Sequence, residues 1–486
     1  MQDNKLIYIL RSLGRKEMTR LVEFAHSPYF NKHEGVQQLL SYLGKVYPQL
    51  DEKHCERKKL FAVLFPGQAH DQAQLAILFT YAFRLTQQFL QIEQGTSEPN
   101  IGHLQLLKQY RLRNLLHLYE KQLNAATQTL EHDPVLDIDS YSWRYQLAAE
   151  ADGYFTATAG RRRDDNLELK HRYLDRFFIA QKLRDACEMQ VRSQILKVEF
   201  HNPLFKAIVA EVEHNLVAYA QDPPILVYFK LYEMIGQNDN TRYFDALNTL
   251  KINEHHFSAD ALKPIYNYFQ NYCIRQINKG DELFLSEIFK LYQAQLEKGL
   301  ILEEGHLSEW HYKNIVTTAL RLREMDWVKH FIDTYKEYLH PDVRDNAYRF
   351  NLASYYYATQ QYAEVLRLLT KVEYSDMRYN LGAKALLLRT YYDLDEYDAL
   401  CSLADSFKQY LLRNKLMADV RRQGYHNLFK FTRRAAAIRL NLDFTRSEKS
   451  RQELDKLEHQ IQKTADIFNK GWLVEKVAGL KGRVGG

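Results

Sequence analysis

The sequence has few of the residues that interrupt regular structure. Its 486 residues include only 19 Gly and 10 Pro, roughly half of their usual joint share. Sheets of many short strands need frequent turns, and long disordered tails are rich in Pro and Gly, so both are disfavoured. Only four cysteines are present, widely separated along the chain, which excludes a disulfide framework and a paired CxxC zinc site.

Long apolar runs and an excess of one charge are also missing. No run approaches the roughly 20 apolar residues of a membrane-spanning helix. Charges on both sides of the short apolar stretch near the N-terminus do not fit a signal peptide. The 66 Lys and Arg nearly balance 61 Asp and Glu, for a net charge of +5, so nucleic acid or an anionic membrane does not attract the whole molecule. These features predict a soluble, cytoplasmic protein with reduced thiols.

The motifs of common enzyme classes are absent. The chain contains no GxxxxGK[ST], no GxGxxG after a strand, no HExxH and no GxSxG, which argues against P-loop nucleotide hydrolysis, zinc proteolysis and serine hydrolysis. His255-His256 and His54-Cys55 are adjacent pairs, and adjacent side chains on a helix do not converge on one metal ion. We therefore predict no catalytic residue, no metal ion and no cofactor.

Helical periodicity runs along nearly the whole chain. Apolar residues recur three and four positions apart, and the strict alternation of a half-buried strand hardly appears. We expect at least about 65% of the residues to be helical, roughly twice the average for soluble proteins. The predicted fold class is all-α.

A repeat of 35 residues organises the last third. Asn351-Leu352-Ala353 and Tyr356 recur as Leu386-Leu387-Leu388 and Tyr391, and Tyr362, Val365 and Leu369 recur as Tyr397, Leu400 and Ala404. The spacing is close to the 34-residue period of tetratricopeptide (TPR) repeats, although the early Trp of that pattern is replaced here by Arg349 and Lys384. A plain helical bundle would bury the same apolar residues but would not explain the spacing. The prediction is a degenerate TPR-like α-solenoid.

Periodicity and its interruptions divide the chain into five segments. They are a helical N-terminal domain at 1–95, a linker at 96–102, a middle region of α-hairpins at 103–300, the TPR-like array at 301–440 and a C-terminal docking or capping helix at 446–480. The linker is placed where Gly, Ser, Pro and Asn break the pattern. The C-terminal helix is expected to begin at Ser450, with Glu453 completing a capping box, and to cover the array's own end or bind a partner.

Four stretches carry a resemblance to a known family. They are SLGRKEMTRLVEFAHSPYFNKHE at 12–34, WHYKNIVTTALRLREMDWVKHFIDTYKEYL at 310–339, LLLRTYYDLDEYDALCSLADSFKQYLLRNK at 386–415 and NKGWLVEKV at 469–477. In these stretches the chain resembles a bacterial family of TPR-like helical-repeat proteins of unknown function, over nearly its full length. The resemblance implies the fold and supplies neither catalytic residues nor an activity.

One segment departs from the overall charge balance. Residues 413–439 contain eight basic residues and a single acid, Asp419, which gives a local charge of +7. The bases are Arg413, Lys415, Arg421, Arg422, Lys430, Arg433, Arg434 and Arg439, and Tyr425, Phe429 and Phe431 lie among them. Such a segment can bind single-stranded nucleic acid through phosphate pairing and base stacking. It also fits an amphipathic helix that packs its aromatic residues in the core and leaves the bases in solvent.

A spacing within the same segment resembles a ribonuclease motif. Arg421 and His426 are separated by four residues, as in the Arg-x4-6-His motif of HEPN nucleases. Such spacings also arise by chance in a sequence of this composition, and Arg111 with His117 is another. A HEPN-like ribonuclease is therefore the third of three functional hypotheses.

The first hypothesis is a non-catalytic scaffold that binds a protein or peptide partner. Stacked helical hairpins form an extended groove, and rigid amphipathic tyrosines suit a protein interface. The candidate partner-binding residues are Tyr356, Tyr357, Tyr391 and Tyr392. The second hypothesis is a nucleic-acid-binding regulator that uses Arg421, Arg422, Lys430, Arg433 and Arg434.

Overall fold

The protein is built almost entirely of helices. The computed structural model describes residues 4–97, 99–158, 165–237, 239–369, 377–413, 419–442 and 447–485. About 81% of the described residues are helical, which confirms the all-α prediction. In the described part of the chain, the only strands are β1 (Leu302–Glu303) and β2 (His306–Leu307), which pair as a short antiparallel hairpin. None of the described helices is long and apolar enough to cross a membrane.

The chain forms two compact units. Unit 1 comprises residues 1–189 and 199–229, and unit 2 comprises residues 190–198 and 230–486. Two helices contribute residues to both units: α10 (Asn166–Leu196) and α12 (Pro223–Gly236). The apolar periodicity from Leu167 to Ile195 predicts one helix of near 35 residues, and α10, with 31 residues, agrees with it.

The N-terminal part of unit 1 has its own hydrophobic core. Its helices are α1 (Lys5–Ser12), α2 (Arg15–His26), α3 (Glu34–Val46), α4 (Glu52–Cys55), α5 (Arg57–Leu64) and α6 (Gln72–Ser97). One cluster of buried side chains runs from Leu6 to Phe89. The Asp71 carboxylate accepts hydrogen bonds from the backbone N–H groups of Ala73 (2.8 Å) and Gln74 (3.2 Å), so Asp71 caps α6 as its sequence position suggests.

The described residues of the predicted linker, 96–97 and 99–102, are helical in the structure. Helix α6 continues to Ser97, and α7 (Pro99–Leu112) begins at Pro99. Pro is tolerated in the first turn of a helix because its missing N–H would have no intrahelical acceptor there. The Gly, Ser and Pro residues that suggested a flexible linker therefore lie within helices on both sides of residue 98.

The remainder of unit 1 is held by polar contacts as well as by apolar packing. It contains α8 (Leu116–His132), α9 (Ile138–Thr158) and α11 (Phe205–His214), together with its part of α10 and α12. Arg111 on α7 pairs with Glu150 on α9 at 2.7 Å. Glu150 is buried, and the Tyr119 hydroxyl donates to its backbone carbonyl at 3.1 Å. These bonds join α7, α8 and α9.

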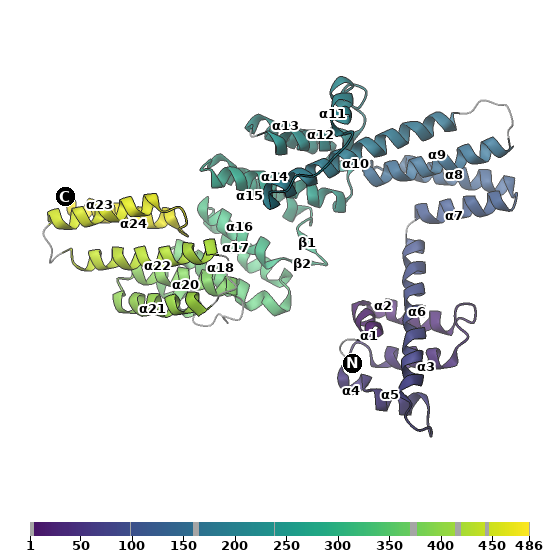
Figure 1. Ribbon diagram of the computed structural model, residues 1–486, viewed down its shortest axis with the longest axis horizontal. Helices are drawn as coiled ribbons and strands as arrows, with labels where there is room; N and C mark the ends of the chain where they lie inside the picture. Colours follow the sequence, from purple (N-terminus) through teal and green to yellow (C-terminus); the bar gives the residue numbers. More distant parts are fainter. Residues whose placement is uncertain are drawn as a thin grey trace. The chain divides into compact units, whose positions relative to one another are not determined.

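Unit 2 is a succession of helical hairpins (Figure 1). The helices that follow α12 are α13 (Asn240–Asn253), α14 (Ala259–Asn278), α15 (Leu283–Glu297), α16 (Glu309–Arg321), α17 (Met325–Tyr335), α18 (Pro341–Ala358), α19 (Tyr362–Leu369), α20 (Met377–Asp393), α21 (Tyr397–Arg413) and α22 (Asp419–Leu440). Short 3-10 turns at Glu254–His256 and Lys336–Tyr338 follow α13 and α17.

The same turn closes three consecutive hairpins. Arg323, Gln360 and Asp395 each adopt a left-handed conformation, with φ of 62°, 61° and 62°. In each turn the next residue donates its backbone N–H to a carbonyl five residues back, at 3.0, 2.8 and 2.9 Å respectively. This is the hydrogen bond of a Schellman C-cap. The turns at Gln360 and Asp395 are 35 residues apart, as the repeat in the sequence predicts, whereas the turn at Arg323 precedes Gln360 by 37 residues.

Each hairpin of this series packs on the next. The first helices contact one another, α16 with α18, α18 with α20 and α20 with α22. The second helix of each hairpin contacts the first helix of the following one, as α17 does with α18 and α19 with α20. The repeated apolar residues Leu352, Ala353, Val365, Leu387, Leu388 and Leu400 are all buried.

The C-terminal segment differs from the prediction of one helix at 446–480. It forms two packed helices, α23 (Ser447–Lys463) and α24 (Lys470–Gly485), which lie side by side (Figure 1). The turn contains Asn469 in a left-handed conformation (φ 53°), which Asn tolerates better than most residues. The Phe468 backbone N–H donates to the Gly424 carbonyl at 3.3 Å. Helix α23 begins three residues before Ser450, so Ser450 lies in its first turn and is not the N-cap.

Candidate functional site

Two of the four predicted partner-binding tyrosines are engaged inside the protein. The Tyr357 hydroxyl donates to Asp393 at 2.5 Å, and the Arg389 guanidinium lies 4.2 Å from the centre of the Tyr357 ring. Burial raises the pKa of Tyr357, so the hydroxyl stays protonated and acts as a donor. Tyr392 is only 3% exposed, and burial raises its pKa to about 12. Contacts within the chain therefore engage the Tyr357 hydroxyl and bury most of Tyr392.

The C-terminal hairpin covers these two tyrosines. Lys476 on α24 pairs with Asp393 at 2.7 Å, and the Asp393 side chain is only 7% exposed. The Trp472 ring meets the Tyr392 ring edge-on at 5.4 Å and lies 5.4 Å from the Arg389 guanidinium. Helix α24 therefore docks on the chain's own hairpins, which is the self-docking arrangement favoured from the sequence.

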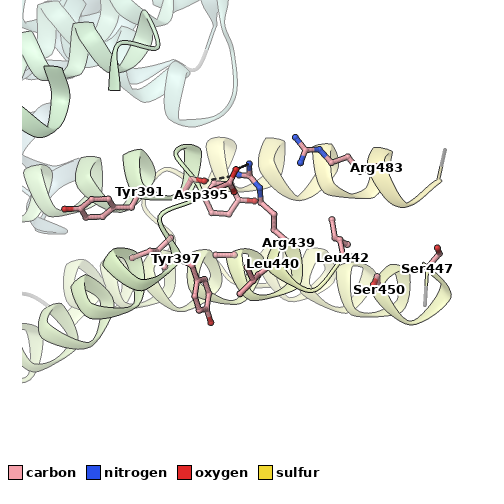
Figure 2. A pocket seen from close by; sticks show the side chains of 12 residues that line it. Tyr391, Asp395, Tyr397, Arg439, Leu440, Leu442, Ser447, Ser450 and Arg483 are labelled. Atoms are coloured by element: carbon pink, nitrogen blue, oxygen red, sulfur yellow. Dashed lines mark hydrogen bonds and ion pairs between the residues drawn. The ribbon is translucent and has the colours of Figure 1, made fainter. Parts of the chain in front are cut away.

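The other two tyrosines, Tyr356 and Tyr391, are half-buried. Tyr391 lines a cavity of about 410 Å³ between the α20–α21 turn, the end of α22, and the C-terminal hairpin. Its lining residues are Tyr391, Tyr392, Asp395, Tyr397, Leu400, Ala436, Arg439, Leu440, Leu442, Ser447, Ser450 and Arg483. Figure 2 shows Arg483 on one side of this cavity and Leu440, Leu442 and Ser450 on the other.

The two arginines of the cavity differ in their pairing. Arg439 donates to Asp395 at 2.6 Å and to the Tyr392 carbonyl at 2.9 Å, so it forms part of the wall (Figure 2). Arg483 is exposed and forms no ion pair with any described residue. The lining thus sets the unpaired Arg483 beside two tyrosines and two serines, and an exposed guanidinium suits an acceptor-rich ligand such as a carboxylate.

The aromatic residues of the basic segment are core residues. Phe429 and Phe431 are each 4% exposed, and Phe429 stacks on Phe407 at 4.1 Å. Tyr425 stacks on Phe468 at 4.2 Å, and burial raises its pKa to about 12. These rings do not present free faces on which nucleic-acid bases can stack. The amphipathic alternative therefore describes α22.

Several of the basic side chains have partners within the chain. Arg433 pairs with Asp405 at 2.7 Å, and Arg434 donates to the Gln460 amide oxygen at 2.7 Å. Arg422 pairs with Asp419. Arg421 and Lys430 are exposed, and Lys415 lies outside the described residues. Two acids outside the segment, Asp405 on α21 and Asp395 in the turn between α20 and α21, each offset one of its charges.

His426 lies in a second hollow, between α21 and α22. This hollow has a volume of about 320 Å³ and is lined by Ala404, Asp405, Phe407, Lys408, Leu411, His426, Phe429, Lys430 and Arg433. Arg421 is not among these residues. Positions five apart on an α-helix point about 140° apart around the axis, so Arg421 and His426 do not converge. The spacing that resembles a HEPN motif does not assemble a site on this helix.

We predict that His426 titrates below its ordinary pKa of 6.5. Burial lowers the pKa of the imidazole, and Lys430 and Lys408 lower it further. The unfolded chain therefore binds this proton more readily than the folded protein does. The free energy of unfolding is unaffected by this group above about pH 6.5 and decreases as the pH falls below that value.

Lys430→Met should raise the pKa of His426, which NMR can measure, with His426→Asn to assign the signal. Lys456→Met, on exposed surface of α23, should not change it, and a wild-type midpoint of 6.5 or above would contradict the prediction.

Sequence reasoning missed the ion pair between Asp393 and Lys476, and it missed Arg483 in the Tyr391 cavity. Asp393 and Lys476 are 83 positions apart, and no local pattern connects them. Arg483 belongs to a helix that the sequence did not separate from the one before it. The single available signal was the pair Trp472 and Leu473, which continued the apolar stripe of the C-terminal segment.

No known chemistry can be assigned to the chain by comparison. Among the described residues, no group of three or more His, Cys, Asp or Glu side chains is placed to hold a metal ion. No family model, no curated protein and no solved structure matches the sequence or the fold.

Proposed function

We propose that the protein is a non-catalytic scaffold whose TPR-like array, residues 301–440, binds a protein or peptide partner. The observation that supports this proposal is the recurring turn at Arg323, Gln360 and Asp395, combined with the packing of each hairpin on the next. Repeat proteins of this kind expose extended surfaces for binding.

We place the partner at the cavity that contains Tyr391. The unpaired Arg483 can donate to a carboxylate, and the rings of Tyr391 and Tyr397 can provide aromatic contact surface for a peptide. Tyr357 does not line this cavity, and Tyr392 lines it but is only 3% exposed, so neither is a main contact residue in this proposal. Nucleic acid is a weaker candidate because the aromatic residues of α22 are buried.

The double variant Tyr391→Ala/Arg483→Glu tests this proposal. Tagged full-length protein is purified from its own host, with and without nuclease, and the copurified proteins are quantified by mass spectrometry. We expect the variant to recover the specific partner at least about tenfold less well than wild type, because it removes an aromatic anchor and reverses the unpaired charge. Nuclease should have no effect.

A matched control is Tyr338→Ala/Arg321→Glu, which changes the same residue types at exposed positions elsewhere in unit 2. This control should recover the partner as wild type does, and circular dichroism should show all three proteins folded. Equal recovery by both variants would refute the site. Loss of the partner after nuclease treatment would favour the nucleic-acid hypothesis.

A further inference from the structure

A third hollow, separate from the Tyr391 cavity and the His426 hollow, lies in the N-terminal domain. It has a volume of about 660 Å³ and lies between the start of α1, the start of α5 and one face of α6. Its lining residues are Asn4, Lys5, Leu6, Arg57, Gln72, Leu75, Ala76, Phe79, Thr80, Phe83, Arg84 and Gln87. This hollow is not part of the proposed function and is independent of it.

The charge of the hollow has one sign. Lys5, Arg57 and Arg84 line it, and none of its lining residues is acidic. All three cations are exposed, and none forms an ion pair with a described residue. Two described acids that neighbour the lining residues in sequence are engaged by other groups, since Asp71 caps α6 and Glu56 pairs with Lys59 at 3.2 Å. Unpaired cations of this kind attract a negatively charged ligand.

The shape of the hollow is elongated. Its lining residues on α6 recur three and four positions apart from Gln72 to Gln87. At about 1.5 Å per residue, this face extends for roughly 22 Å, or about four helical turns. Ala76 is exposed and Phe83 is half-buried along the floor, whereas Gln72 and Gln87 add amide groups. The surface is therefore a groove with apolar and polar lining and a cationic rim.

We infer that this groove binds an acidic amphipathic helix of a partner protein. A helix of about four turns matches its length, the helix's apolar face fits the floor, and acidic side chains pair with Lys5, Arg57 and Arg84. Single-stranded nucleic acid fits less well, because Phe79 is only 7% exposed and the groove offers no fully exposed ring for base stacking. A small anion would leave most of the groove unfilled.

The experiment uses the full-length protein and a fluorescein-labelled helical peptide of about 16 residues. The peptide has Leu at alternating three- and four-residue spacing and Glu at most other positions. Fluorescence anisotropy should show binding that weakens as salt rises. Lys5→Glu/Arg57→Glu/Arg84→Glu should weaken it at least about tenfold, and Ala76→Trp, which fills the floor without changing charge, should weaken it similarly.

Two controls isolate the groove from general electrostatics. Lys16→Glu/Lys32→Glu/Lys45→Glu makes the same change in net charge on exposed positions of the same domain, and Ile77→Trp adds the same ring to α6 outside the groove. Both should bind the peptide as wild type does. Three results would each overturn the inference. One is no binding of the peptide at about 1 mM, and another is a loss of peptide binding in the control variants as large as in the groove variants. The third is an oligonucleotide that binds more tightly than the peptide and whose binding the groove variants abolish.

Discussion

Leu352→Asp is expected to lower the free energy of unfolding of unit 2 by about 4 kcal/mol or more. Leu352 is 6% exposed and lies on α18, a helix that packs against α16, α17, α19 and α20. The substitution removes buried apolar contacts and places an unpaired carboxylate where no water can solvate it. For a unit of this size, the melting temperature should fall by roughly 10 °C, which differential scanning calorimetry can measure.

The matched control is Ala358→Asp, at an exposed position of the same helix. A new acid in the last helical turn opposes the helix dipole and should cost less than about 1 kcal/mol. Leu352→Ala should give an intermediate loss, because it removes the contacts without introducing a charge. A melting temperature unchanged by Leu352→Asp would mean that the hairpins do not pack through this residue.

The second large effect is expected from Asp393→Asn, which should cost about 2 to 3 kcal/mol. The substitution keeps an oxygen that accepts from Tyr357 but leaves the Lys476 ammonium without its carboxylate. The Lys476 ammonium would lose its partner in a largely buried site and could not be fully rehydrated. Its side chain is 26% exposed, so water compensates for part of the loss in free energy of unfolding. Chemical denaturation should show the loss, and proteolysis should cut α24 faster than in wild type.

Asp395→Asn, two positions further on, is the control for this prediction. Its ion pair with Arg439 has an exposed carboxylate, with 63% of the side chain accessible, so the expected cost is below about 1 kcal/mol. The double variant Asp393→Asn/Lys476→Met should recover most of the stability lost in the single variant, since no unpaired charge remains. Additive losses in the double variant would show that the two groups do not stabilise the docked hairpin through each other.

Local patterns predicted most of the fold because helices and their turns are local structures. The periodicity predicted α10 as one long helix, and the cap at Asp71 was identified from its sequence position. The 35-residue spacing predicted the burial of Leu352 and Val365. The helical course of 96–102 was not predicted, because Pro99 is compatible with either a linker or a first helical turn.

Long-range contacts determined what the sequence could not predict. The C-terminal segment divides into α23 and α24 because Phe468 bonds and packs against α22, more than forty positions away. Tyr357 and Tyr392 had the right chemistry for an interface, but Tyr392 is buried against Trp472 of α24, and the Tyr357 hydroxyl donates to Asp393, which pairs with Lys476 of α24. The basic segment showed its charge in the sequence, whereas its partners Asp405 and Gln460 lie on other helices.

The recurring turn has a mechanical consequence. Gln360 and Asp395 occupy equivalent turns 35 residues apart, and the contacts between hairpins run mainly from each one to the next. A chain pulled from its ends should therefore extend in steps, one hairpin at a time, and each released hairpin of this length adds roughly 120 Å of extended polypeptide. Because the Lys476–Asp393 pair attaches α24 to α20, a force applied at the C-terminus should break that attachment before the array begins to lengthen.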